Sequence, residues 1–315
     1  MENSNLSYKK RIKTAGLSAV PNVKKTLLAA ALLSIFSSGA FAYQVTVDNG
    51  YYGVASTESP VISNPESVIS NTVSGGAYKR VVGGYYTNLN SGTSNEKEAY
   101  EYNFDSITTT LNGTTVNQEA TAGNRHSFGW REGEHPPKAF SMSFKTGTTT
   151  LTLNNATFLD SSVNPNNGDY HFSLITAGDY LKDRAENYTN PQISKSDIGT
   201  ANLNINGGNY DTLIYGGSHI YAYAGRNAVM NANVDTSNIT IKGGTFSKNT
   251  HIFGGGAFYN YGTWIDSDGC GVVNTVGKST ISITGATLKG DIYAGGVIAG
   301  TDYTYNANGH TLMSL

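Results

Sequence analysis

The sequence is poor in cysteine and in charge, and both shortages exclude classes of protein. Among its 315 residues there is one cysteine, and 14% of the residues are charged. A single cysteine excludes a disulfide-stapled scaffold and any zinc module built from several cysteines. The net charge of -2 provides no basic surface for a nucleic acid, so no nucleic-acid partner is expected.

Glycine and tyrosine, by contrast, are abundant, with 37 and 21 residues. Hydrophobic residues make up 38% of the chain, and the net charge is small. Disordered chains combine low hydrophobicity with high net charge, so this composition favours a folded protein.

The N-terminal segment, 1–42, has the layout of a secretory signal peptide. Six basic residues precede a short apolar run over 27–36, and Ala40-Phe41-Ala42 follows as a cleavage site. A membrane anchor is the alternative, but about ten apolar residues span only ~15 Å as a helix, against ~30 Å for a bilayer core. We therefore expect the Sec machinery to export the chain, with cleavage between Ala42 and Tyr43.

The predicted mature chain, from Tyr43 onward, is weakly acidic, with 15 basic and 22 acidic side chains. The basic region before the apolar run is unusually long, which resembles the signal peptides of large bacterial surface proteins secreted by the type V route. Residues 43–67 are expected to form an N-terminal cap, and residues 68–315 the main domain.

Short runs of alternating aliphatic and polar residues recur through the mature chain. Leu151-Thr152-Leu153, Leu203-Asn204-Ile205, Ile239-Thr240-Ile241 and Ile281-Ser282-Ile283 are four such runs. A period of two predicts strands with one buried face, and no stretch sustains a helical period. The sequence therefore predicts an all-β fold.

Each run is followed by a similar string: a Gly-Gly turn, an aromatic residue, a second aliphatic run and another Gly-Gly pair. Copies lie near 71–84, 151–178, 201–217, 237–256 and 279–296. Glycine pairs suit sharp corners, where a Cβ would clash or φ must be positive. The glycines expected at these corners are Gly75, Gly76, Gly83, Gly84, Gly207, Gly208, Gly216, Gly217, Gly243, Gly244, Gly254, Gly255, Gly285 and Gly295.

Repeats of this length predict a solenoid, a propeller or an array, in which each unit buries its apolar face against its neighbours. We expect Leu153, Ile205, Ile241 and Ile283 to occupy equivalent inward positions in a core ladder. Coils of roughly 20–25 residues would give about 11–13 rungs.

The string Ile239–Phe246, followed by Ile252–Gly256, resembles the passenger repeats of bacterial autotransporters. The likeness is clearest over 199–303 and extends in patches back to about 68. It implies a right-handed parallel β-helix, exposed on the cell surface or secreted through the periplasm of a Gram-negative bacterium.

The resemblance also implies an outer-membrane translocator barrel as a partner, which this sequence does not contain. The barrel is expected either in a continuation of the reading frame or as a separate protein. The second arrangement would resemble two-partner secretion. Asn164-Pro165 is faintly similar to a motif of that family, although Asn-Pro is also a common turn signal.

Aromatic residues follow the glycine corners in register. If they emerge on one side, they form a stripe able to stack on sugar rings or on a partner protein. If they cover the edge of the coil instead, they stack on one another between rungs. The candidate ligand-facing residues are Tyr215, Tyr221, Tyr223, Phe253, Tyr259, Tyr261 and Tyr293.

Other polar groups give weak signals. Glu134 and His135 fit either an acid–base pair or a charged insertion that ends at Pro136-Pro137. Asp266–Gly269 has the start of a calcium loop but lacks the later glutamate ligand, so a turn is the simpler interpretation. Cys270 lies between two glycines and is expected to be a lone thiol. No catalytic, metal or cofactor site is predicted.

These observations predict an exported surface protein with an adhesive, non-enzymatic role in virulence, which binds a host glycan or matrix ligand. The main alternative is a polysaccharide lyase or glycosidase, because parallel β-helices also carry such enzymes. Glycoside hydrolysis needs two carboxylates about 5–9.5 Å apart. Asp160, Asp211 and Asp291 fall in turns of different repeats, which does not fit such a pair.

Overall fold

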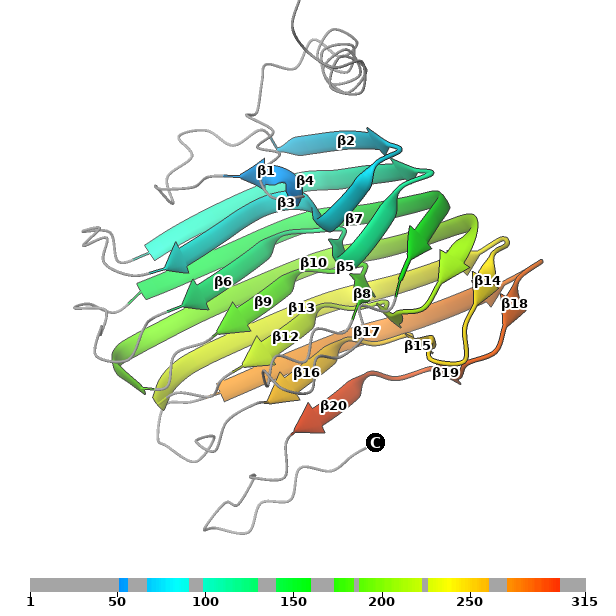
Figure 1. The fold of residues 1–315 in the computed structure, drawn as a ribbon. Helices are drawn as coiled ribbons and strands as arrows, with labels where there is room; N and C mark the ends of the chain where they lie inside the picture. Colours follow the sequence, from blue (N-terminus) through cyan, green and yellow to red (C-terminus); the bar gives the residue numbers. More distant parts are fainter. Residues whose placement is uncertain are drawn as a thin grey trace, which may run out of the picture. The chain divides into compact units, whose positions relative to one another are not determined.

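Parallel strands make up the described part of the chain. The computed structural model describes residues 51–55, 67–90, 99–129, 140–159, 173–183, 187–222, 226–260 and 271–300. All of these belong to the unit Gln44–Leu315. Every pairing between strands in these ranges is parallel, and the strands join into one sheet (Figure 1). Within them no helix is found, and so none that could cross a membrane.

The strands form three ladders, because each strand pairs with its counterpart in the next repeat (Figure 1). The first ladder contains the long strands β2 (Val68–Ser74), β4 (Ala99–Asn112), β7 (Phe140–Phe158), β10 (Asn187–Tyr210), β13 (Arg226–Ile241) and β17 (Gly271–Ile283). The second contains β5 (Thr115–Thr121), β8 (Leu174–Thr176), β11 (Leu213–Tyr215), β15 (His251–Phe253) and β19 (Ile292–Tyr293). The third contains β6 (Arg125–Gly129), β9 (Tyr180–Asp183), β12 (His219–Ala222), β16 (Ala257–Asn260) and β20 (Val297–Gly300).

The remaining strands complete these ladders. In the first repeat β3 (Ala77–Asn90) serves both short ladders, because it pairs with β5 and then with β6. β1 (Tyr51–Ala55) lies against β3. β14 (Thr245–Phe246) and β18 (Thr287–Leu288) continue the register of β10 just beyond the first glycine corner.

The aliphatic alternation in the sequence sets the core. Leu153 pairs with Ile205, Ile205 with Ile241, and Ile241 with Ile283, so the four expected positions lie in one ladder. The first three side chains are at most 1% exposed, whereas Ile283 is partly buried. Their intervening polar neighbours face outward, as the period of two requires.

Each turn of the fold contains more residues than the sequence predicts. Leu111, Leu153, Ile205, Ile241 and Ile283 are successive partners in the long ladder. The sequence numbers of successive partners in this ladder differ by 42, 52, 36 and 42. The shorter coil expected from the sequence is therefore wrong. Both Gly-Gly corners of a repeat belong to the same turn, and the ladder of long strands has six described members.

The structure contains a turn that the Gly-Gly motif does not predict, between the repeats near 71–84 and 151–178. Val73 pairs with Leu111 and Leu111 with Leu153, so β4, β5 and β6 form a complete repeat between them. This repeat has Asn112-Gly113 at its first corner and Ala122-Gly123 at its second. Because neither is a Gly-Gly pair, the motif does not reveal it.

Glycine is needed at the two corners of a turn for different physical reasons. At the first corner Gly208 has φ +111°, a conformation that L side chains rarely adopt. At the second corner Gly216 has no positive φ, but a Cβ there would lie 2.5 Å from the Gly254 carbonyl oxygen and would clash with the Ser237 side chain. Ser237 is fully buried in β13. The second corner therefore bends inward until its backbone touches the long strand.

This inward bend separates two apolar clusters. On one side lies the main core around Ile205, Ile214 and Ile241. On the other side Ile220 packs with side chains of the third ladder and with Met230 of the long strand β13. The outer surface of the second corner therefore faces away from both clusters, and it carries the residues described below.

Shortening one side chain of the core ladder should cost stability in proportion to its burial. We expect Ile241→Val to lower the free energy of unfolding by about 1 kcal/mol, the usual cost of a lost buried methylene. Ile283→Val, at the next position of the same ladder, should cost less than half as much because Ile283 is partly exposed. Urea denaturation of both variants measures the difference, and equal losses would contradict the gradient of burial.

Candidate functional site

The candidate site is the outer surface at the second glycine corner. On β11, Ile214 points into the main core while the next residue, Tyr215, belongs to a separate cluster on the other face. On β12, Ile220 lies in the interior, and Tyr221 belongs with Tyr215. Because side chains alternate along a strand, the second and third ladders both present aromatic residues on this outer surface.

Aromatic side chains stack in two columns that follow the ladders. In the first, the ring centroids of Tyr215 and Phe253 are 5.3 Å apart, and those of Phe253 and Tyr293 are 4.8 Å apart. In the second, His219 lies between Tyr180 at 4.8 Å and Tyr259 at 5.3 Å, with nearly parallel rings. These spacings are close to the ~4.8 Å distance between strands, so strand pairing itself sets the stacking.

The exposure of the first column changes along its length. Tyr215 is 0% exposed, Phe253 9% and Tyr293 45%. The expectation that Tyr215 and Phe253 face a ligand is wrong, because both rings are buried against their stacking neighbours. Tyr221 and Tyr259 are half-buried. Tyr223 and Tyr261 lie outside the residues whose side chains are described.

A hydroxyl pair joins the two columns. The phenol oxygens of Tyr215 and Tyr259 are 3.1 Å apart, and burial raises the pKa of both groups. We expect Tyr215→Phe and Tyr259→Phe each to cost about 1 kcal/mol of stability, as is usual for one neutral hydrogen bond. The double variant should lose less than the sum of the single losses, because both substitutions break the same bond. Fully additive losses in denaturation experiments would show that the hydroxyls do not interact.

A buried ionic cluster adjoins the columns. Glu119 pairs in register with Leu174, and Arg125 with Tyr180, so both side chains lie on the same face of the strands as the aromatic columns, where they are buried. Both carboxylate oxygens of Glu119 accept from Nε of Arg125, Oε1 at 3.0 Å and Oε2 at 3.1 Å, and Nε of Arg80 lies 3.3 Å from Oε2. Thr121 donates a further bond to Glu119 at 3.0 Å.

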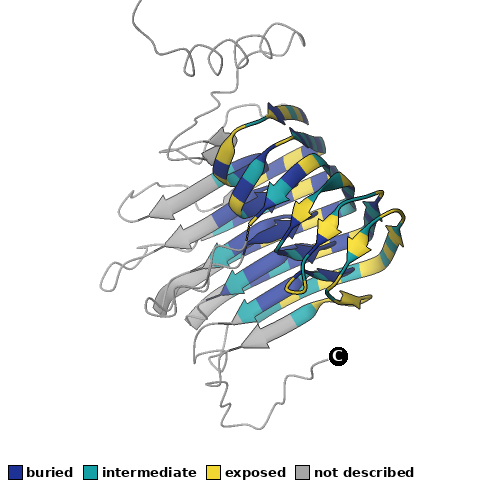
Figure 2. Ribbon diagram, turned by 45° about the vertical axis from the view of Figure 1, so that its right-hand side comes forward, coloured by how far each residue is buried: buried dark blue, intermediate teal, exposed yellow. Residues whose placement is uncertain are grey.

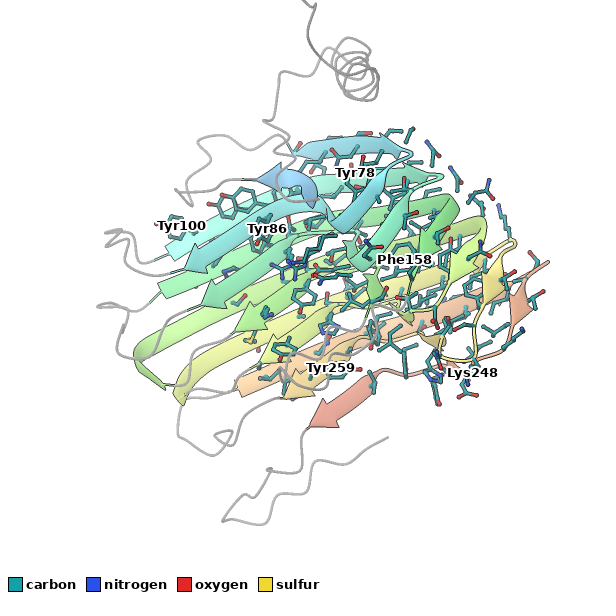
Figure 3. All side chains as sticks on the ribbon, in the orientation of Figure 1. Tyr78, Tyr86, Tyr100, Phe158, Lys248 and Tyr259 are labelled. Atoms are coloured by element: carbon teal, nitrogen blue, oxygen red, sulfur yellow. The ribbon has the colours of Figure 1, made fainter. Side chains whose placement is uncertain are left out.

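Arg125 extends the second column. Its guanidinium carbon lies 4.9 Å from the ring centroid of Tyr180 and 5.1 Å from that of Tyr86. The line of planar groups therefore runs Tyr86, Arg125, Tyr180, His219 and Tyr259, with its two ends labelled in Figure 3. Cation–π contacts of this kind are stronger when they are shielded from water. The line thus holds one fixed positive charge between aromatic faces.

The electrostatics of the cluster keep Glu119 ionised. Burial alone would raise the pKa of this carboxyl group, but the charges of Arg125 and Arg80 and the bonds that the carboxylate accepts outweigh it and lower the pKa. The pKa of Arg125 is raised, because the pairing with Glu119 outweighs its burial. A carboxylate held in this way has no proton to donate and is a weak proton acceptor, and its negative charge offsets part of the positive charge of the two arginines.

Two of the described histidines, His126 and His219, are not placed for acid–base work. Burial, with the charge of Arg125 second, lowers the pKa of His126 to about 3, and its Nδ1 lies 2.8 Å from the Ser194 hydroxyl. Burial also lowers the pKa of His219 to about 3. Both rings are therefore neutral at physiological pH. His251 is half-exposed, and its Nδ1 lies 3.4 Å from a carboxylate oxygen of Asp291.

A second polar group lies in the interior, at Asp179. Its carboxylate accepts a bond from the Asn124 backbone N–H at 2.6 Å and one from the Ser196 hydroxyl at 2.8 Å. Asp179 is 1% exposed. Burial raises its pKa to about 6, although these hydrogen bonds act in the opposite direction. The group links the second corner to the long strand β10.

Most weaker sequence signals fall outside the described residues. These are Glu134, His135, Asp160, the segment 266–269, Cys270 and the signal-cleavage residues Ala40, Ala42 and Tyr43. Of the remaining carboxylates in turns, Asp211 accepts a hydrogen bond from Ser247. In the described ranges no three His, Cys, Asp or Glu side chains gather as they would around a metal ion.

The ionic cluster and Asp179 were missed in the sequence. A usable signal was present: Glu119 stands at the repeat position that holds Leu174 and Leu213 in the next two turns and His251 in the turn after them. A charge at a position that is aliphatic in the two neighbouring turns marks a special site. The signal is visible only when the turn that contains Glu119 is aligned with the others, and that turn has no Gly-Gly pair to mark it.

Comparison with protein-family models, with curated proteins and with solved structures finds no match to this chain.

Proposed function

We propose that this protein is an exported cell-surface passenger of an autotransporter-like system, folded as a right-handed parallel β-helix, with an adhesive rather than an enzymatic role. The observation that carries the proposal is the register of the glycine repeats. The strings after Ile205, Ile241 and Ile283 lie on adjacent parallel strands, with Gly216 of one turn donating its N–H to Phe253 of the next. The signal-peptide pattern over 1–42 supports export.

The adhesive surface is assigned to the outer aromatic columns. Tyr259 and Tyr293 are the members with accessible ring area, and they lie on neighbouring ladders beside polar residues. Tyrosine offers a large apolar face and a hydroxyl group, which suits it to sugars and to protein ligands. Stacking behind these rings holds them rigid, so little side-chain entropy is lost on binding.

A polysaccharide-degrading enzyme fits the described residues less well. Such a site needs two carboxylates on one face, one of them able to give or take a proton. On the aromatic surface, the oxygens of Glu119 are already bound to Arg125 and Arg80. Asp291, which accepts a hydrogen bond from Tyr293, lies several turns further along the same ladder, so the two carboxylates do not form a pair. Incubation with pectin-like polymers should therefore release no reducing ends or unsaturated products.

The export part of the proposal is tested by expressing the chain in a Gram-negative host, joined in frame to a translocator barrel. We expect the mature protein to begin at Tyr43 and to be removed from intact cells by added protease. A variant with Ala40→Lys and Ala42→Lys is the control, since it should leave the leader uncleaved. An N-terminus at Met1 in the unmodified protein, together with full protection from protease, would reject export.

The adhesive part is tested by coating beads with purified protein and measuring attachment to mucin and extracellular matrix. Attachment should saturate, and the double variant Tyr259→Ala with Tyr293→Ala should lower it at least about tenfold, the effect of losing aromatic anchors. Ser282→Ala, an exposed change on β17, is the matched control and should have no effect. If the double variant attaches as strongly as the control variant, the aromatic columns are not the adhesive surface.

A further inference from the structure

One ring of the outer aromatic columns does not lie in the row that its register gives it. Tyr259 pairs with Tyr221 on the preceding turn, and Ala257 pairs with His219. The ring of Tyr259 nevertheless stacks on His219, with ring centroids 5.3 Å apart and ring planes 11° from parallel. One of these two side chains therefore leans along its strand by two residues to meet the other.

His219 stays in its own row. Its ring centroid lies 4.8 Å from that of Tyr180, its register partner on the turn before, and the two ring planes are 10° from parallel. The side chain that leaves its row is therefore Tyr259. His219 is 4% exposed, so almost none of its ring is available to a ligand.

Ala257 provides the space that Tyr259 occupies. Ala257 and Tyr259 point to the same face of β16, because side chains two residues apart on a strand share a face. At the position of Ala257 the two preceding turns carry the rings of Tyr180 and His219, and a methyl group leaves room there for a ring from elsewhere. Ala257 is 0% exposed and belongs to the cluster on which Tyr259 packs, so the displaced ring covers it.

A hydroxyl contact fixes the direction of the displaced ring. The phenol oxygen of Tyr259 lies 3.1 Å from that of Tyr215, which is 0% exposed. The hydroxyl group of Tyr259 is therefore turned toward the second ladder. Every described side chain of β9, β12 and β16 is buried or half-buried (Figure 2), so the orientation of Tyr259 strongly affects the ring area that the third ladder presents.

We infer that His219 positions Tyr259 for ligand binding, with Ala257 as the gap that admits the ring. The inference rests on the proposed adhesive function, which assigns Tyr259 to the ligand-binding surface. His219 is a positioning residue, because it is buried and acts by holding one face of the tyrosine ring. A ring that is held before the ligand arrives loses little conformational freedom on binding.

Two substitutions of His219 test the inference on the mucin or matrix surface to which the parent protein attaches. His219→Ala removes the ring behind Tyr259 and should raise the protein concentration for half-maximal attachment at least about threefold, the effect of freeing one large side chain. His219→Phe keeps a flat ring that can stack and should stay within about twofold of the parent. Phe246→Leu is the matched control, because Phe246 stacks on Tyr210 in the main core, and it should leave attachment unchanged.

A second readout needs no ligand. Burial raises the pKa of the Tyr259 phenol above its ordinary value of 10.0. In His219→Ala the ring should reach water, and its pKa should fall toward that value. The tyrosine NMR signal that is absent from Tyr259→Phe identifies the group, and its titration measures the change. Ala257→Leu should have the same effect, because the larger side chain fills the gap and displaces the ring.

Three results would overturn the inference. A folded His219→Ala variant with the attachment or the Tyr259 titration of the parent would show that the ring is held without His219. Equal losses of attachment in His219→Ala and His219→Phe would show that stacking is not the cause. An equal loss in Phe246→Leu would indicate a general loosening of the fold. Where His219→Ala does not fold, Ala257→Leu decides by the same readouts. A parent protein that attaches to neither surface would reject the proposed function alone, and the titration would still test whether His219 holds Tyr259.

Discussion

Replacing Glu119 by glutamine is expected to lower the free energy of unfolding by about 3–5 kcal/mol, the usual cost of removing one partner of a buried ion pair. Glu119 is 4% exposed and is ion-paired with two guanidinium groups, those of Arg80 and Arg125, and Arg125 is 3% exposed. Glutamine keeps the size of the side chain but removes its charge, so Arg125 is left buried between Tyr86 and Tyr180 without a counter-charge.

Urea denaturation at neutral pH measures this loss, with Glu101→Gln as the control. Glu101 is an exposed residue of β4, and its replacement should change stability by less than about 0.5 kcal/mol, as surface substitutions usually do. Similar effects for the two variants would show that the cluster is not shielded from water.

The pH dependence of the Glu119 contribution has a definite sign. The folded-state pKa of Glu119 is lowered below its ordinary value of 4.5. The ionised carboxylate therefore contributes fully to the free energy of unfolding above pH 4.5. This contribution is lost as the pH falls through the lowered folded-state pKa. The stability difference between the parent protein and Glu119→Gln should therefore shrink in acid. A difference that grows in acid would contradict the assigned direction.

The core of the fold is readable from the sequence because one physical rule governs it. A strand with one buried face must alternate, so Leu153, Ile205, Ile241 and Ile283 could be aligned from their neighbours alone, and the structure pairs them in that order. The length of a turn could not be read in this way. Gly-Gly pairs mark corners, but the local sequence does not say how many corners one turn contains.

The candidate site was less predictable because it depends on contacts across turns. The aromatic positions repeat visibly, but whether a ring is covered depends on its neighbour in the next turn, as the contrast between Tyr215 and Tyr293 shows. Glu119 and Arg125 are close in sequence, but Arg80 joins them only through the pairing of β3 with β5. Such a cluster is specified by register, which the sequence defines only after every turn has been recognised.

Asp179 is expected to cause the second large change in stability. The stability that it contributes falls as the pH rises, whereas the contribution of Glu119 is lost as the pH falls. Burial raises the folded-state pKa from an ordinary value of 3.8 to about 6. Between these two values the folded protein retains a proton that the unfolded chain has lost, so stability falls as the pH rises from about 4 to about 6. The shift corresponds to a loss of about 3 kcal/mol by pH 7, at about 1.4 kcal/mol for each pKa unit.

Asp179→Asn removes this titration while keeping an oxygen that can accept from the Asn124 backbone and an amide that can donate to Ser196. The variant should therefore gain stability relative to the parent protein, by up to about 3 kcal/mol, as the pH is raised from 4 to 7. Urea denaturation at several pH values measures the difference, with Asp197→Asn, an exposed change on β10, as the control. Both the parent and the Asp179→Asn variant contain Glu119, so its opposite pH dependence cancels. A difference that stays constant with pH, like that of the control, would show that water reaches Asp179 and that its carboxylate is not desolvated.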